Sequence, residues 1–419
     1  MNKQRKEIIL SFLNIFISIK ELLLIVKIFS RKRFVIVNSD RVGHLSLDPM
    51  ALLELFNKNL EFKKNFIILF PKKKCSNLFL QAKIISLLKE NQFSCYETNL
   101  DVFLARVFFK KHKKENDYLN KKIQRYRLRD LYLNNKFKVF YMPKTVYEEG
   151  KIYNKNYNSK INFSKKEKSR ENEIINRYNL NDERKKYICL LARDNEYLNK
   201  TTNYNSSYHD YRNSNYLDFN SVIFFINEKK NSKVLRMGNV KKKLNKNLFN
   251  SKHLDIFDES KDGFEDIALI KNCCFFICDT AGIANIATLF NIPVLRHNWI
   301  PISNSSSYRT LIIPKLIKNK VTGQFLEYKK IFKDFAKGDI YKMRYNQFYI
   351  DNNLDIINND VDILIETTKE MYKRIEFNFD FESNDNLQKN FESWLKDYDI
   401  YNPGLLSKSF KEKYEKLIY

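Results

Sequence analysis

Residues 273–298 read CCFFICDTAGIANIATLFNIPVLRHN, and this stretch decides the fold class of the chain. Cys274–Cys278 is a short apolar run that predicts a buried strand. A turn of small and polar residues follows, then a helical pattern over Gly282–Phe290 and a second apolar run over Pro293–His297. A strand, a helix and a strand in this order predict parallel strands joined by a crossover helix.

The same alternation extends outward from this stretch in both directions. Further strands are predicted at Arg33–Ser39, Phe66–Phe70, Tyr187–Arg193 and Lys233–Met237, and further helices at Met50–Asn57, Phe219–Lys230 and Asp262–Asn272. At 419 residues the chain is long enough for two domains. We therefore predict an α/β fold with two Rossmann-like domains, at residues 34–178 and 179–345, followed by a helical tail at residues 346–419.

The N-terminal segment, residues 1–33, is apolar and basic. Its longest uncharged run, Ile8–Ile19, has 12 residues, which is too short for a membrane span of about 20 residues. A basic flank, Arg31–Arg33, follows it, and no cleavage site of a signal peptide is present. We expect an amphipathic helix on an anionic membrane surface, at the cytoplasmic face of the plasma membrane. The alternative is a helix that packs on the protein itself.

The composition narrows the class of partner. The formal net charge is +26, but Lys and Asn are abundant throughout and no nucleic-acid-binding motif accompanies them. This favours phosphorylated substrates or anionic lipid over nucleic acid as the partner. The six cysteines form no pair with zinc-ligand spacing and no disulfide framework, which favours a reducing cytoplasm.

Polar residues follow the predicted strands, where parallel α/β sheets bind their ligands. The turn Asp279–Thr280–Ala281–Gly282 would expose backbone N–H groups at the start of a helix, and Gly282 would let a phosphate approach the backbone. The alternative is an ordinary turn capped by Asp279 and Thr280.

A second group of polar residues follows the strand at Tyr187–Arg193. Two arginines and a histidine near one strand end suit phosphate binding, because arginine makes bidentate charged contacts. The residues are Arg193, Asp194, His209, Arg212 and Asn213, and Arg236 and Gly238 lie at a third strand end. The alternative is a surface loop with an Asp194–Arg212 ion pair.

In the first domain, Arg41, Gly43 and His44 follow the first strand. A neutral imidazole there is a suitable general base for an acceptor hydroxyl. The alternative is a histidine with a structural role only.

Several motifs are missing from the sequence. It has no GxGxxG fingerprint and no GxxxxGK[ST] phosphate loop, which argues against a dinucleotide oxidoreductase and a P-loop kinase. The acidic pairs Asp360/Asp362 and Asp380/Glu382 do not end a predicted strand, as a metal-nucleotide DxD motif should.

The residues that carry a family resemblance are RVGHL, CLLARD with YRNSNYLDF, VLRMG, and FFICDTAGIANIATLFNIPVLRHN with the later IIPKL. With these motifs the chain resembles a glycosyltransferase family of bacterial surface-polysaccharide loci, over residues 33–330 and the terminal LLSKSFKEKY. DTAGIANIATLFNIPV is also similar to the donor-binding segment of heptosyltransferases and other GT-B enzymes, which commonly reads (S/T)DSGxxHxAxxxxxP. Asn285 stands where many of these enzymes have histidine.

The resemblance implies two Rossmann-like domains that face each other across a cleft, and a metal-independent transferase without a cofactor. The C-terminal domain would bind a nucleotide-sugar donor, and the N-terminal domain a glycan or lipid-linked acceptor. The expected donor-binding residues are Arg193, His209, Arg212, Asn213, Arg236, Gly238, Asp279, Thr280, Ala281, Gly282 and Asn285. Arg41 and Gly43 are expected at the acceptor, and His44 and Asp194 in catalysis. The alternatives are a metal-dependent GT-A transferase and a non-catalytic assembly protein that binds carbohydrate or lipid.

Overall fold

The computed structural model describes residues 33–72, 75–99, 139–141, 152–181, 187–194, 206–238, 252–256, 262–302, 306–398, 400–401 and 403–418. The helix predicted before residue 33 lies outside these residues.

The N-terminal domain is built on a parallel sheet with strand order β3-β2-β1-β4. The strands are β1 (Arg33–Ile36), β2 (Phe66–Pro71), β3 (Ser94–Thr98) and β4 (Val139–Tyr141). The helices are α3 (Val42–Phe56), α4 (Leu60–Asn65) and α5 (Leu78–Glu90), while α10 (Lys165–Arg177) packs against α13 (Phe264–Asn272) of the C-terminal domain. β2 is buried along its whole length, as expected for a parallel strand covered on both faces.

Helix α3 begins earlier than the sequence predicts. The helix was predicted over Met50–Asn57, but it runs from Val42 and contains Pro49. Leu45 and most of the residues that follow it are buried against the sheet. This burial outweighs the backbone N–H that proline lacks, a case in which packing overrides local propensity. His44 therefore lies in the first turn of a helix and not in a loop.

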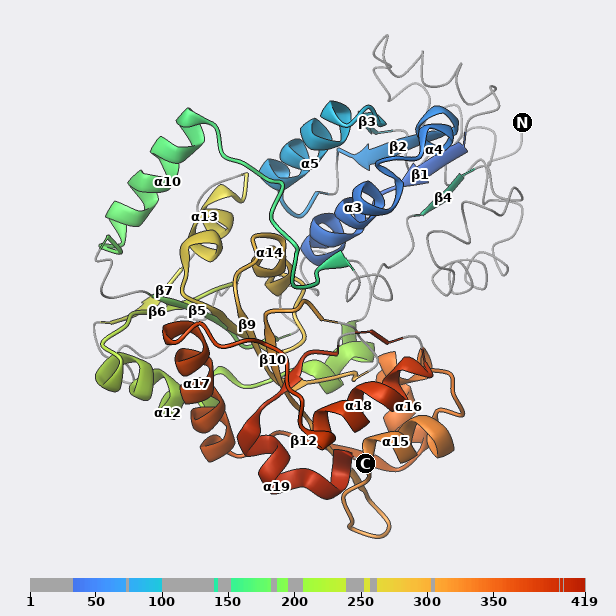
Figure 1. Cartoon of the computed structure of the whole chain (residues 1–419), viewed down its shortest axis with the longest axis vertical. Helices are drawn as coiled ribbons and strands as arrows, with labels where there is room; N and C mark the ends of the chain where they lie inside the picture. The colour runs from blue at the N-terminus through green and yellow to red at the C-terminus, as the bar shows by residue number, and fades with distance from the viewer. Residues whose placement is uncertain are drawn as a thin grey trace, which may run out of the picture.

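The C-terminal domain is built on a seven-stranded parallel sheet with strand order β13-β10-β9-β8-β5-β6-β7. Its strands are β5 (Ile188–Leu191), β6 (Val234–Arg236), β7 (His253–Asp255), β8 (Phe276–Cys278), β9 (Val294–Trp299), β10 (Thr310–Pro314) and β13 (Leu405–Leu406). The strand order reverses between the parallel neighbours β5 and β8, and ligands bind at such a switch point in parallel α/β folds. The prediction of two parallel α/β domains is confirmed (Figure 1).

Helices cover both faces of this sheet. One face carries α13 (Phe264–Asn272) and α14 (Ala284–Leu289), and the other carries α12 (Asn220–Phe224) with α17 (Val361–Glu376). The helix predicted over Phe219–Lys230 is α12 continued by a π-helical turn, η4 (Phe225–Lys229).

The remaining elements complete the C-terminal domain. They are β11 (Leu316–Asn319), β12 (Leu354–Ile357), α15 (Tyr328–Lys330), η6 (Ile331–Phe335), η7 (Lys342–Arg344), α16 (Asn346–Asp351), α18 (Asn386–Lys396) and α19 (Lys408–Ile418). The tail adds β13 to the sheet edge beside β10, and α18 and α19 pack into the core of the same domain.

The two domains meet where α3 packs against α14 (Figure 1). We call this contact the seam, and its central residues are Gly43 on α3 and Gly282 in the turn before α14. A single apolar cluster runs through the contact, from Val35 and Phe70 in the first domain to Phe264 and Leu289 in the second. Further out, the backbone N–H of Phe79 in α5 donates to the Asp262 carbonyl before α13 at 2.9 Å.

Candidate functional site

The carboxyl ends of β5 and β8 lie side by side at the switch point of the sheet. The backbone N–H of Arg193, after β5, donates to Oδ2 of Asp279, after β8, at 2.7 Å. Burial raises the pKa of the Asp279 carboxyl to about 6, although the N–H and the positive charge of Arg193 oppose this shift. Two residues that the sequence predicts at the donor thus lie beside each other.

The turn after β8 directs its polar groups at the protein itself. Thr280 Oγ1 donates to the carbonyl of Ile300 at 2.5 Å and accepts its N–H at 3.1 Å. The Ala281 N–H donates to the Asp279 carbonyl at 2.9 Å. A Cβ on Gly282 would lie 3.1 Å from the backbone nitrogen of Gly43. The sequence assigned this space to a phosphate, but the backbone of α3 occupies it, because the domains pack there.

Asn285 is also a seam residue. Its side-chain amide donates to the Gly43 carbonyl at 3.3 Å, and its oxygen accepts from Arg296 at 3.4 Å. Arg296 lies in β9, is buried and stacks on Trp299 at 4.4 Å. The asparagine thus links the two domains through a backbone carbonyl.

The turn η2 (Ser206–Arg212) carries two of the predicted donor-binding residues, His209 and Arg212. Arg193 Nη1 donates to the carbonyl of His209 at 3.2 Å and to Oδ1 of Asn213. Burial, and then the neighbouring charge of Arg212, lower the pKa of Arg193. Arg193 is thus occupied in holding η2 in place, so it is less free to bind a ligand than its sequence position suggested.

The protein orients the guanidinium of Arg212 without using all of its hydrogen-bond donors. Its Nε donates to the hydroxyl of Tyr211 at 2.8 Å, and the guanidinium lies over the Tyr211 ring at 5.1 Å. Within the described ranges its two terminal nitrogens have no hydrogen-bond partner and no ion pair, so the alternative Asp194–Arg212 pair is not formed. A half-buried guanidinium with two free donors suits a bidentate contact with phosphate.

Two residues at this site were missed by the sequence reading. Lys315 follows β10, is buried, and donates from Nζ to the carbonyls of Tyr211 and Asn213 at 3.1 and 2.8 Å. Asp48 on α3 accepts or shares the proton of His44 Nδ1 at 2.9 Å. The spacing of four residues on a helix could have indicated the His44–Asp48 pair. The lysine had only its place after IIP as a signal.

The His44–Asp48 pair has the geometry of an oriented base. Asp48 is buried, and the His44 side chain is 19% exposed. A carboxylate on Nδ1 fixes the imidazole ring and leaves Nε2 for another partner. Arg41, three residues before His44, donates from Nη2 to the hydroxyl of Tyr208 in η2 at 3.0 Å. The start of α3 and the turn η2 are therefore in contact.

Three predicted residues have other surroundings. Arg236 is buried, pairs with Asp255 at 3.4 Å and stacks on Tyr216 at 4.5 Å. Gly238 has a φ of 101° and packs against Leu191. Asp194 is exposed at the end of a described segment. Their predicted roles stay predictions.

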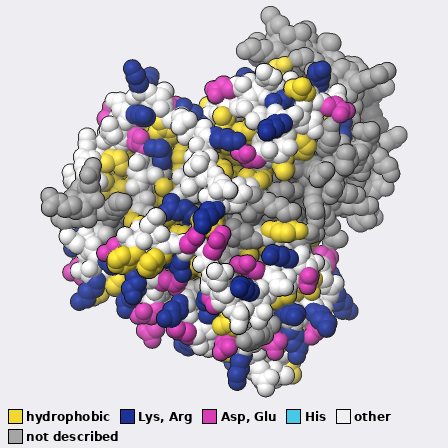
Figure 2. Space-filling model, in the orientation of Figure 1, with side chains coloured by type: hydrophobic (Ala, Val, Ile, Leu, Met, Phe, Trp, Pro, Cys, Tyr) yellow, Lys and Arg dark blue, Asp and Glu magenta, His cyan; other side chains and the backbone are white. Residues whose placement is uncertain are grey.

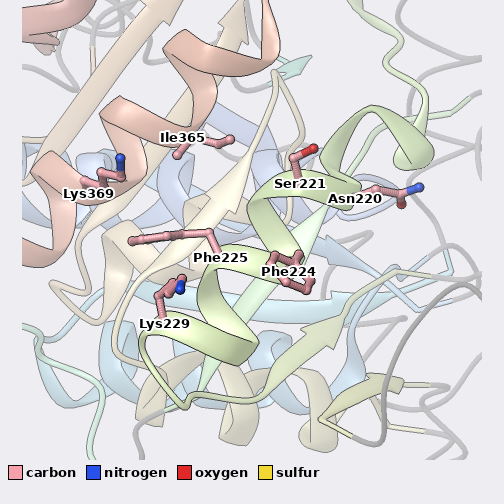
Figure 3. A pocket seen from close by; sticks show the side chains of 7 residues that line it. All are labelled: Asn220, Ser221, Phe224, Phe225, Lys229, Ile365 and Lys369. Carbon is pink, nitrogen blue, oxygen red and sulfur yellow. The ribbon is translucent and has the colours of Figure 1, made fainter.

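A groove of about 730 Å³ lies elsewhere, on the helical layer between α12 and α17 (Figure 3). Its walls are largely apolar, with Phe224, Phe225 and Ile365 in the middle and Lys229 and Lys369 at one end. It contains no acid–base pair and none of the strand-end residues, so we do not assign the chemistry to it.

In the described part of the chain, no cluster of three or more His, Cys, Asp or Glu side chains could hold a metal ion. No helix of the described residues is long and apolar enough to cross a membrane. Figure 2 shows basic and acidic side chains interspersed over the described part of one face, without a single basic stripe.

No protein-family model and no curated protein sequence matches the chain. Among solved structures it is similar to ADP-heptose LPS heptosyltransferase II of E. coli, with 13% identity, a TM-score of 0.40, and coverage of 68% of this chain and 90% of that one. A glycosyl transferase of family 9 from Veillonella parvula DSM 2008 has 11% identity, a TM-score of 0.38, and coverage of 68% and 86%. The E. coli heptosyltransferase WaaC has 8% identity, a TM-score of 0.33, and coverage of 67% and 92%. At such low identity we infer function from the contacts of this chain.

Proposed function

We propose that the chain is a glycosyltransferase that moves a sugar from a nucleotide-sugar donor to a hydroxyl of an acceptor. One observation carries the proposal: the start of α3, the helix with the His44–Asp48 pair, contacts the turn that carries Arg212 through the Arg41–Tyr208 hydrogen bond of 3.0 Å. A base for a hydroxyl beside cations for a departing diphosphate is what this reaction needs.

The proposed step uses these groups in fixed roles. Asp48 holds Nδ1 of His44, and Nε2 accepts the proton of the acceptor hydroxyl. The hydroxyl oxygen forms the new bond to the anomeric carbon while the bond from that carbon to the donor's phosphate oxygen breaks. The electron pair of the broken bond leaves with the nucleoside diphosphate, whose charge Arg212 stabilises.

We further propose that the transfer does not require a metal ion, because side-chain cations meet the diphosphate. Activity in excess EDTA tests this. Loss of activity in EDTA with recovery in manganese or magnesium would move the protein to the metal-dependent GT-A alternative.

The acceptor and the location are proposals that rest on the sequence. A surface-polysaccharide or lipid-linked acceptor follows from the family resemblance, and attachment to the cytoplasmic face of the membrane from the apolar and basic residues 7–33. Deletion of residues 1–32 should release the protein from anionic vesicles in a sedimentation assay. Continued sedimentation would mean that another surface binds the membrane.

The direct test is a panel of nucleotide sugars screened by thermal shift and then by turnover. A ligand that binds only the folded state must raise the melting temperature. Release of nucleoside diphosphate that depends on both acceptor and His44 would support the enzyme. Stabilisation without turnover by any donor and acceptor would favour the non-catalytic assembly protein.

A further inference from the structure

Lys315 is held rigidly at the carboxyl end of β10. Its side chain is only 4% exposed, its backbone N–H donates to the Trp299 carbonyl at 3.1 Å, and its own carbonyl accepts the hydroxyl of Tyr328 at 3.1 Å. Its Nζ reaches the carbonyls of Tyr211 and Asn213, the two residues that flank Arg212 in the chain. The ammonium therefore holds the backbone on both sides of the one arginine in η2.

Arg193 holds the same turn from the other side. Its guanidinium donates to the His209 carbonyl and to the Asn213 side chain. The Ser214 N–H returns a bond to the Arg193 carbonyl at 3.0 Å. The turn that carries Arg212 is thus fixed between a strand end at β5 and a strand end at β10, on either side of the switch region.

We propose that Lys315 is a positioning residue of the donor site, which holds Arg212 for the diphosphate through the carbonyls of Tyr211 and Asn213 and does so as a charged ammonium. This inference rests on the proposed function. Lys315 itself does not need to touch the ligand, because its two hydrogen bonds end on the backbone carbonyls of Tyr211 and Asn213.

The charges around Lys315 make this contact sensitive to pH. Asp279 faces it from the β8 end, Arg193 from the β5 end and Asp218 from the turn η3 (Tyr216–Phe219), while His297 lies in β9. Tyr211 and Tyr328 complete its surroundings and are neutral, because burial raises their pKa values. Among the described residues no carboxylate forms an ion pair with Lys315.

Burial lowers the pKa of Lys315 to about 8, against the attraction of Asp279 and with the repulsion of Arg193. A group with a lowered pKa loses its proton as the pH rises through that value. A bound diphosphate adds negative charge and favours the ammonium, so binding should take up protons near this pH. The affinity for a diphosphate should therefore fall as the pH rises above about 8.

The test compares Lys315→Met, Lys315→Arg and the control Lys318→Met on β11, with UDP and ADP as probes in calorimetry. At about pH 7, Lys315→Met should weaken binding about tenfold or more, because two charged hydrogen bonds are lost. Lys315→Arg keeps a charge that does not titrate in this range, so its affinity should stay flat above about pH 8. Lys318→Met should behave as wild type.

A double-variant cycle separates positioning from general stability. If Lys315 acts through Arg212, then Lys315→Met should have little further effect on binding in an Arg212→Ala background. Equal affinity of folded Lys315→Met and wild type, or the same pH dependence in Lys315→Arg and wild type, would overturn the inference alone. Absence of UDP and ADP binding in wild type would overturn the proposed donor site and this inference with it.

Discussion

Two turns follow neighbouring strands of the C-terminal sheet, and they use their polar groups in opposite ways. The turn after β8, Asp279–Gly282, bonds to Arg193 and Ile300 and packs on Gly43. The turn η2, reached from β5, presents Arg212 with two terminal nitrogens that form no hydrogen bond or ion pair with a described residue. From the sequence both turns were predicted to bind the donor.

The difference shows what decides whether a strand-end turn binds a ligand. Small residues and a hydroxyl suit an anion site, but they suit a close contact between two backbones equally well. The turn after β8 packs against the start of α3. A change in this turn would therefore affect catalysis through His44, which lies in that helix. The turn η2 is instead held from outside by Arg193 and Lys315, which leaves its arginine available.

The largest effect is expected at His44, the proposed base, whose helix packs against the turn after β8. His44→Ala should lower kcat by about 10²–10⁴-fold, the usual contribution of a general base. Asp48→Asn should have a smaller effect, since the ring keeps a partner at Nδ1 but loses the carboxylate. Turnover with saturating donor measures both. Wild-type turnover in His44→Ala would return this histidine to a structural role.

Arg212 should give the next largest effect and test the other turn. Arg212→Ala should lose about 3 kcal/mol of transition-state stabilisation, roughly a hundredfold in rate, and Arg212→Lys should lose less, because it keeps the charge without the fork. Arg374→Ala, which removes a partner of Glu370 on α17, is the matched control. If Arg212→Ala and the control have the same kcat, η2 has no more functional importance than the turn after β8.

Asp279 tests how strongly the turn after β8 affects the stability of the fold. Its pKa is raised from 3.8 to about 6, so the folded state holds the proton more tightly than the unfolded state, and stability should fall as the pH rises from about 4 to 6. Asp279→Asn removes this loss, which amounts to at most ~3 kcal/mol for such a shift. Urea unfolding at a series of pH values measures it. Parallel curves for variant and wild type would mean that the neighbouring cations satisfy the carboxylate fully.

The smallest effect is expected at the glycine contact. Gly282→Ala would place a Cβ 3.1–3.2 Å from the backbone of Gly43, so α3 must shift, at a cost of about 1–3 kcal/mol of stability. Thermal unfolding measures the loss, and calorimetry should show little change in UDP or ADP affinity. Weaker nucleotide binding at unchanged stability would restore the anion site that the sequence suggested.

The strands with continuous apolar runs were predictable because burial on both faces of a parallel sheet leaves a strong pattern. Cys274–Cys278 and Pro293–His297 correspond to β8 and β9 within one or two residues. Helix α3 was predicted from Met50 and begins at Val42, since Gly43 and Pro49 look like breaks until their burial is known. The short edge strand β13 has only two residues and no pattern to detect.

The sequence by itself determined which chemical groups stand at the strand ends: two arginines, an aspartate, and a histidine after the first strand. Each of these residues follows a strand in the chain, so the order of residues in the sequence was enough to predict it. Only the tertiary structure decided which of these groups bond to the protein itself and which stay available for a ligand. Gly43 meets Gly282 across 239 positions of the chain, and Lys315 reaches Tyr211 across 104. Such contacts form when segments far apart in the chain pack together, and a pattern of neighbouring residues contains no record of them.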